Sequence, residues 1–153
     1  MLQKLQKRKE NGFTIIEVLI VLAIAGLILL VVFLAVPALQ RNSRNTQKKN
    51  DVAAILGGIS EYVNNSGGTM PTAKADFCPN VKLGYYTGTD CADITFTANS
   101  GTTVTGASGT VFVKTGAKCS GANFTATNAS GRNVAAVYTV ETGGGTQTIC
   151  QES

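Results

Sequence analysis

The spacing of apolar and polar residues divides the chain into parts with different periods. Residues 18–39 form an apolar run without a single charged side chain. As a helix this run is roughly 33 Å long, enough to cross the hydrocarbon core of a bilayer. Gly26 and Pro37 lie inside the run, and membrane helices tolerate both residue types. The pattern predicts a membrane-spanning helix near the N-terminus.

The helical pattern continues beyond this run, where it becomes amphipathic. Apolar residues are spaced three and four apart on one face, at Val52, Ile55, Leu56, Ile59, Tyr62 and Val63. We expect this stripe to lie under a β-sheet. The charged residues before and beside it should face water or a neighbouring molecule; they are Arg44, Lys48, Lys49 and Asp51. The sequence NNSGG at residues 64–68 should end the helix.

After residue 66 the apolar period changes to two. Runs rich in Val, Thr, Tyr and Phe predict strands at residues 82–87, 94–98, 110–115, 134–141 and 147–150. Three consecutive glycines, Gly143 to Gly145, should join the last two strands into a hairpin. Residues 99–109 are rich in Gly, Ser and Thr, and we expect a mobile loop there. The predicted fold class is α+β, with a long N-terminal helix packed on a C-terminal antiparallel sheet.

One carboxylate, Glu17, lies directly before the N-terminal end of the apolar run. An ionisable group in such a place is costly and is usually kept for a function. Before it come Gly12 and Phe13, preceded by a short basic leader containing Lys4, Lys7, Arg8 and Lys9. This combination resembles the N-terminus of type IV pilins and pseudopilins, the substrates of prepilin peptidase. The resemblance covers about the first 65 residues, since the heads of these proteins diverge freely.

The resemblance implies a division of the chain and a role for three residues. Cleavage would fall between Gly12 and Phe13, Phe13 would be N-methylated, and Glu17 would guide assembly. Residues 1–12 would be a cleaved leader, 13–40 a transmembrane and polymerisation helix, 41–65 its amphipathic continuation, and 66–153 a disulfide-bonded β-rich head. The implied function is a structural subunit of a type IV pilus, most like a major pilin. The alternative is a minor pilin, or a pseudopilin of a type II secretion or DNA-uptake system.

The implied partners are copies of the same chain, prepilin peptidase, the membrane, and the assembly platform with its ATPase machinery. Two other interpretations remain open on the residues alone. A conventional signal peptide should have an apolar region of about 7–15 residues that ends in small residues. The A-x-A match at residues 23–25 instead lies in the middle of the run. A plain membrane anchor with an incidental Glu17 is the other interpretation, and neither explains Gly12, Phe13 and Glu17 together.

The distribution of charged residues bears on the net charge of residues 13–153 and on the orientation of the chain in the membrane. The formal net charge of +4 is mostly in the leader, because residues 13–153 contain nine basic and eight acidic side chains. Four basic residues also follow the span closely, namely Arg41, Arg44, Lys48 and Lys49, so the positive-inside rule gives a tie. In such a case the charges before the first span usually decide the orientation of the protein, which places the leader in the cytoplasm. We therefore expect a single-pass precursor in the inner membrane with its head outside, and later an extracellular pilus.

All four cysteines lie in the predicted head, and the chain has no His. An even number of cysteines in a small, polar, extracytoplasmic module indicates disulfides. Three pairings are possible for four cysteines, and we favour Cys78–Cys91 with Cys119–Cys150 because each loop then stays local.

Enzymatic chemistry finds no support in the sequence, and no cofactor is expected. The chain has no His for a general base, no Ser nucleophile motif and no phosphate-binding Gly-rich loop. Asp76, Asp90 and Asp93 lie near two cysteines, where oxygen ligands for calcium are conceivable, but solvated loop charges are the simpler interpretation. Lys114, Lys118 and Arg132 are too few to predict DNA capture.

Overall fold

The computed structural model describes residues 12–86, 91–98, 109–126 and 131–153. The chain forms two units, one ending at Ala38 and the other running from Leu39 to Ser153. Of the predicted loop at residues 99–109, residues 99–108 lie outside the described residues.

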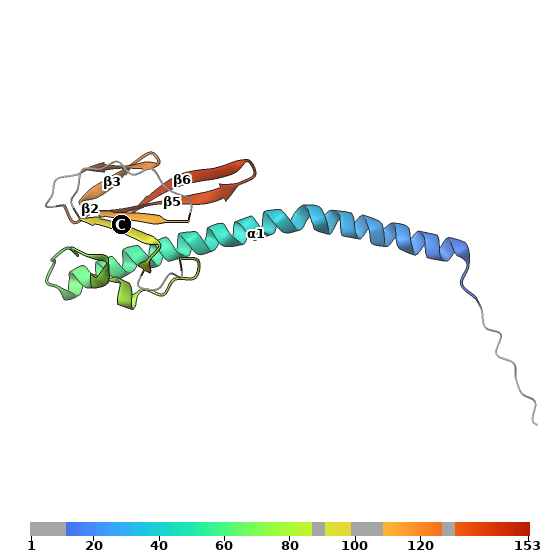
Figure 1. Cartoon of the computed structure of the whole chain (residues 1–153), viewed down its shortest axis with the longest axis horizontal. Helices are drawn as coiled ribbons and strands as arrows, with labels where there is room; N and C mark the ends of the chain where they lie inside the picture. Colours follow the sequence, from blue (N-terminus) through green and yellow to red (C-terminus); the bar gives the residue numbers. More distant parts are fainter. Residues whose placement is uncertain (1–11, 87–90, 99–108, 127–130) are drawn as a thin grey trace, which may run out of the picture. The chain divides into compact units, whose positions relative to one another are not determined.

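The helix α1 extends from Ile15 to Asn65 and passes through Gly26 and Pro37 without interruption (Figure 1). In the first unit, none of the described residues packs against it. The large apolar side chains from Phe13 to Leu39 are exposed by between 40% and 89%. One stretch of α1 is long and apolar enough to cross a membrane, with a mean hydropathy of 3.4. The part of the helix before residue 40 therefore needs an apolar environment that the described residues do not supply.

The C-terminal end of α1 is fixed by two glycines. The N–H of Gly68 donates to the carbonyl oxygen of Val63 at 2.8 Å, and Gly67 has a φ of +66°. This left-handed residue and the long backbone hydrogen bond form a Schellman motif, which satisfies a carbonyl group that the helix end would leave free. The predicted helix stop is confirmed.

The second unit contains a four-stranded sheet in the order β1-β2-β5-β6 and a separate hairpin of β3 and β4. The strands of the sheet are β1 (Ile94–Ala98), β2 (Val111–Thr115), β5 (Val134–Thr142) and β6 (Gly145–Glu152). The hairpin consists of β3 (Ala117–Ser120) and β4 (Asn123–Ala126). Two short 3₁₀ helices, η1 (Lys74–Asp76) and η2 (Cys78–Asn80), precede the sheet. The three glycines join β5 to β6 as predicted: Gly143 and Gly144 form the turn, and Gly145 begins β6 opposite Thr142.

The sheet is mixed where the sequence predicts an antiparallel one, because β1 pairs with β2 in parallel. The β3–β4 hairpin was not predicted. Its strands are four residues each and include Lys, Ser and Asn, which carry little strand preference. The predicted strand at residues 82–87 is wrong over its described residues. The N–H groups of Gly84, Tyr85 and Tyr86 donate to the Asp51 carboxylate at 2.7–3.0 Å, so a side chain takes the place of a neighbouring strand.

Both faces of β5 are buried. One face packs against the apolar stripe of α1 and is made by Val134, Ala136, Tyr138 and Val140. On the opposite face, Ala135 and Val137 pack with Ala117 and Phe124 of the hairpin. On α1, the predicted stripe is confirmed, with Val52, Ile55 and Ile59 fully buried. The head is thus a sheet between the second part of α1 and a small hairpin.

Two charged residues of α1 contradict the expectation that they face water. Asp51 is 5% exposed and Lys48 is 2% exposed. Asp51 is buried because it binds the three N–H groups of the loop at residues 84–86. The Nζ atom of Lys48 lies 4.6 Å from the centre of the Tyr85 ring and 3.4 Å from Glu141 Oε1. Buried charges are expected to have such partners, and here they attach the helix to the head.

Candidate processing and assembly site

The start of α1 holds the three residues to which the sequence assigns processing and assembly. Gly12, Phe13 and Thr14 precede the first helical residue, Ile15. Thr14 is the N-cap: its N–H donates to Glu17 Oε2 at 2.9 Å, and the Glu17 N–H donates to Thr14 Oγ1 at 3.3 Å. The Thr14 hydroxyl also donates to Glu17 Oε2 at 2.7 Å. This reciprocal arrangement is a capping box, and it fixes where the helix begins.

The capping box was not predicted, although its signal was present. A Thr followed three residues later by Glu at the head of an apolar run is typical of a helix N-terminus. The carboxylate to which the sequence assigns assembly is thus also the capping partner of Thr14. The structure therefore gives Glu17 a role within the chain in addition to any role between chains.

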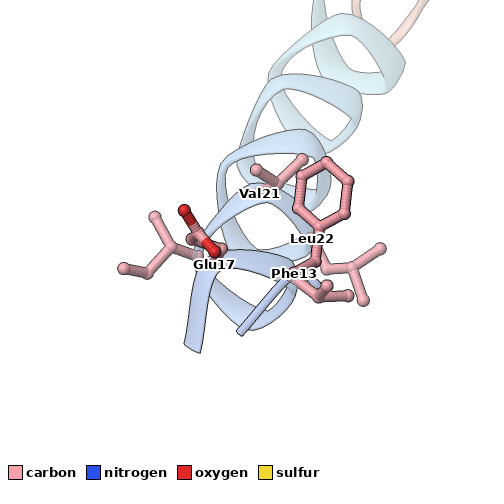
Figure 2. A pocket seen from close by; sticks show the side chains of 6 residues that line it. Phe13, Glu17, Val21 and Leu22 are labelled. Atoms are coloured by element: carbon pink, nitrogen blue, oxygen red, sulfur yellow. The ribbon is translucent and has the colours of Figure 1, made fainter. Parts of the chain in front are cut away.

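The surroundings of Glu17 are apolar and open. Glu17 lines a surface hollow with Phe13, Val18, Ile20, Val21 and Leu22, and Figure 2 shows the carboxylate and Phe13 at the same end of the helix. Phe13 is 89% exposed. Among the described residues, both ion pairs involve Glu141 and neither involves Glu17. The carboxylate is thus held by hydrogen bonds and has room for a cation brought by another molecule.

The two disulfides tie the head together at separate places. Cys78 is bonded to Cys91, with a Cα–Cα distance of 6.2 Å, and this bond joins η2 to the residues before β1. Cys119 is bonded to Cys150, with a Cα–Cα distance of 5.7 Å, and this bond joins the hairpin to β6. These are the local pairs that the sequence analysis favours.

The other residues considered for chemistry do not form a site among the described residues. Asp76 caps η1, since its Oδ2 accepts the N–H groups of Thr72 and Ala73 at 2.9 and 3.0 Å. These hydrogen bonds, the one from Ala73 contributing most, lower the pKa of the Asp76 carboxyl. Asp90 lies outside the described residues. The part of the chain that the structure describes has no group of three acidic, Cys or His side chains suited to a metal. Lys114, one of the three cations considered for DNA binding, is buried.

Comparison with protein families matches residues 7–33 to the prokaryotic N-terminal methylation motif. The chain carries the prepilin signal of type IV pilins and pseudopilins. The match includes Gly12, Phe13, Glu17 and the beginning of the apolar run, which are the residues that the geometry places at the helix start. The prepilin signal implies processing by prepilin peptidase and assembly with other pilins. Comparisons with curated proteins and with solved structures give no match.

The prepilin signal and the apolar helix agree with a membrane-anchored precursor of the pilin type. The motif supports a type IV pilin-like protein or a pseudopilin equally. Such proteins are structural rather than enzymatic. The head, with its sheet packed on a long helix and its two disulfides, has a pilin-like α+β fold.

Proposed function

We propose that the chain is the principal structural subunit of a type IV pilus. The observation that carries this proposal is the start of α1, where a single carboxylate stands at the head of an apolar surface that nothing in the described chain covers. Lipid and copies of the same helix can each shield such a surface from water. A pilin uses lipid before assembly and copies of the helix afterwards.

In the precursor, residues 13–40 span the inner membrane, and residues 41–153 lie outside. The basic leader, residues 1–12, stays in the cytoplasm, where positive charge is favoured. Disulfides persist in an oxidising compartment, and the two bonds of the head agree with this orientation. Glu17 then lies near the cytoplasmic end of the span, with its carboxylate held by Thr14.

Cleavage between Gly12 and Phe13 changes the electrostatics of this end. It removes the cationic leader and leaves an α-amine on Phe13, four residues before Glu17. N-methylation adds a little apolar surface and leaves the amine able to carry its charge. The processed end of the subunit thus carries one cation and one anion on an otherwise apolar helix.

In the filament, the Glu17 carboxylate of one subunit faces the Phe13 ammonium of a neighbour. A charge buried without a partner costs several kcal/mol, whereas a compensated pair is tolerated. The pair therefore selects one register between helices and contributes little net stability. Cohesion comes from the apolar side chains of residues 15–39, at about 25 cal/mol per Å² removed from water. The assembly platform and its ATPase supply the work of extraction from the membrane.

The alternative is a minor pilin, or a pseudopilin of a secretion or DNA-uptake system. The methylation motif fits this alternative as well, because these proteins share the processing step. Abundance separates the two, since a principal subunit makes up most of the fibre mass.

Replacing Glu17 tests its role in assembly, provided that the variant separates the effect of its charge from its effect on the helix cap. Glu17→Gln keeps a side-chain acceptor at the third position of a capping box, where Gln serves as Glu does, but removes the charge. We expect leader cleavage and membrane insertion to continue while fibres are lost or strongly reduced. Glu17→Val should lose fibres as well.

Thr14→Ala is the matched control, because it weakens the cap and leaves the charge of Glu17 in place. It should still form fibres. If Glu17→Gln cells with normal subunit levels display normal fibres, the charge of Glu17 has no part in assembly. If Thr14→Ala loses fibres to the same extent as Glu17→Gln, the cap rather than the charge is what assembly requires.

A further inference from the structure

The segment directly after the apolar run is basic on the side of the membrane where positive charge is usually scarce. Four cations occur within residues 41–49, and we call them the basic collar: Arg41, Arg44, Lys48 and Lys49. In the proposed orientation this collar is extracytoplasmic, where Lys and Arg are depleted near the ends of most spans. We therefore expect the basic collar to have a function on the extracytoplasmic side of the membrane.

The fold of the head accounts for only part of the collar. Lys48 is buried against Tyr85 and Glu141. Glu141 also accepts hydrogen bonds from Arg44, but the Arg44 side chain remains 42% exposed. Arg41 is half-buried and Lys49 is exposed. Neither forms an ion pair with an acidic side chain of the described residues.

Arg41 and Arg44 lie at the level of the lipid headgroups if the apolar run spans the bilayer, and Lys49 lies beyond that level. Leu39 is the last apolar residue of the run, and along a helix Arg41 follows it by about 3 Å, Arg44 by about 8 Å and Lys49 by about 15 Å. The headgroup region adds roughly 5–8 Å beyond the hydrocarbon core on each side. The long side chains of Arg and Lys bend toward an interface, which brings the Lys49 ammonium close to the outer edge of the headgroup region.

We propose that Arg41 and Lys49, with the exposed part of Arg44, bind the phosphate groups of anionic phospholipids at the outer face of the membrane. Each cation near an anionic surface increases the association about fivefold at moderate salt. The collar thereby holds the precursor at one depth until it is extracted. This inference rests on the proposed membrane span, and it does not depend on filament assembly.

A lipid-selectivity measurement on the full chain tests the proposal. The chain contains no Trp, so Leu39→Trp places a single fluorescent reporter next to the collar. The protein is inserted into vesicles of phosphatidylcholine and phosphatidylglycerol that contain a trace of one dansyl-labelled lipid. Energy transfer from the reporter should show about threefold or greater enrichment of labelled phosphatidylglycerol over labelled phosphatidylcholine, and high salt should reduce it.

The double variant Arg41→Gln/Lys49→Gln should bring this enrichment close to one. Lys82→Gln/Lys118→Gln is the matched control, because it removes the same charge from two exposed residues far from the run in the sequence and should retain the enrichment. Equal enrichment in the two double variants, or none in the parent protein, would overturn the proposal. A protein that fails to insert into vesicles of either lipid composition would instead overturn the proposed membrane span.

Discussion

Glu141 at the end of β5 binds Arg44 of α1 with both carboxylate oxygens, which lie 3.0 and 3.1 Å from Arg44 Nε. The two residues are 97 positions apart in the sequence. Asn45 completes the contact, since its side-chain oxygen accepts the Glu141 N–H and its amide nitrogen donates to the Glu141 carbonyl oxygen. This cluster attaches the helix to the β5–β6 hairpin within the second unit, so its removal should weaken the head itself.

The Glu141 cluster should make the stability of the head depend on acid. Hydrogen bonds from Arg44, followed by the charges of Arg44 and Lys48, lower the pKa of Glu141 to about 2 from 4.5. A carboxyl whose pKa is lower in the folded state stabilises the fold above its unfolded pKa, and this contribution is lost as the pH falls toward the folded pKa. Glu141→Gln should therefore lower the Tm at neutral pH. The difference from the wild type should shrink between pH 4.5 and pH 2.

Thermal unfolding followed by circular dichroism across this pH range measures the effect. Glu61→Gln removes an exposed carboxylate elsewhere on α1 and should follow the wild type. A Tm difference between Glu141→Gln and the wild type that stays constant down to pH 2 would show that the cluster acts through packing rather than charge.

Asp51 should be the most sensitive polar residue of the head. Its carboxylate accepts three backbone N–H groups and is 5% exposed. Asp51→Ala leaves these donors without their partner, which should cost about 3 kcal/mol of unfolding free energy. Asp51→Asn keeps one acceptor and should cost less. Asn50→Ala, at an exposed position next to it, is the control for denaturant unfolding, and an equal loss in all three variants would contradict the role of Asp51.

The two disulfides should stabilise the head by constraining its unfolded state. They close loops with sequence separations of 13 and 31 residues. In the chain-entropy model these loops correspond to about 3 and about 4 kcal/mol. Replacing Cys119 and Cys150 with Ser should therefore lower stability at least as much as replacing Cys78 and Cys91. Alkylation of freshly isolated protein before and after reduction checks the bonds directly, and four free thiols would contradict them.

Processing should depend on the residue before the junction. A larger residue in Gly12→Leu should prevent cleavage, so that the intact mass corresponds to a chain that begins at Met1. The wild-type protein should begin at Phe13 and carry one added methyl group. Thr14→Ala is the control, and it should be cleaved as the wild type is. Intact mass spectrometry of membrane-extracted protein decides this, and efficient cleavage of Gly12→Leu would place the junction elsewhere.

The helix, its apolar stripe and its end could be predicted because each depends on neighbouring residues. Val52, Ile55 and Ile59 repeat with the period of a helix, and Gly67 supplies the left-handed residue that ends it. Four strands were likewise visible in the alternation of apolar and polar residues. The position of Glu17 followed from its being the only charge at the head of the apolar run.

Features that depend on contacts between residues distant in the sequence could not be predicted. The partners of Asp51 lie 33 to 35 positions further along the chain, and no local pattern connects them. For the same reason Lys48 was expected to face water, although Tyr85 and Glu141 cover it. The parallel pairing of β1 with β2 depends on how the chain returns between them, which strand periodicity does not encode. The capping box at Thr14 is different, since its signal is local and was overlooked.

We propose that this chain is the principal subunit of a surface filament assembled after cleavage at Gly12. Fibres sheared from cells and purified can be identified by the intact mass of their polypeptides. We expect most of the fibre mass to be a chain of residues 13–153 with two disulfides and one methyl group on Phe13. Fibres made chiefly of another polypeptide, with this chain absent or only a trace component, would contradict this proposal.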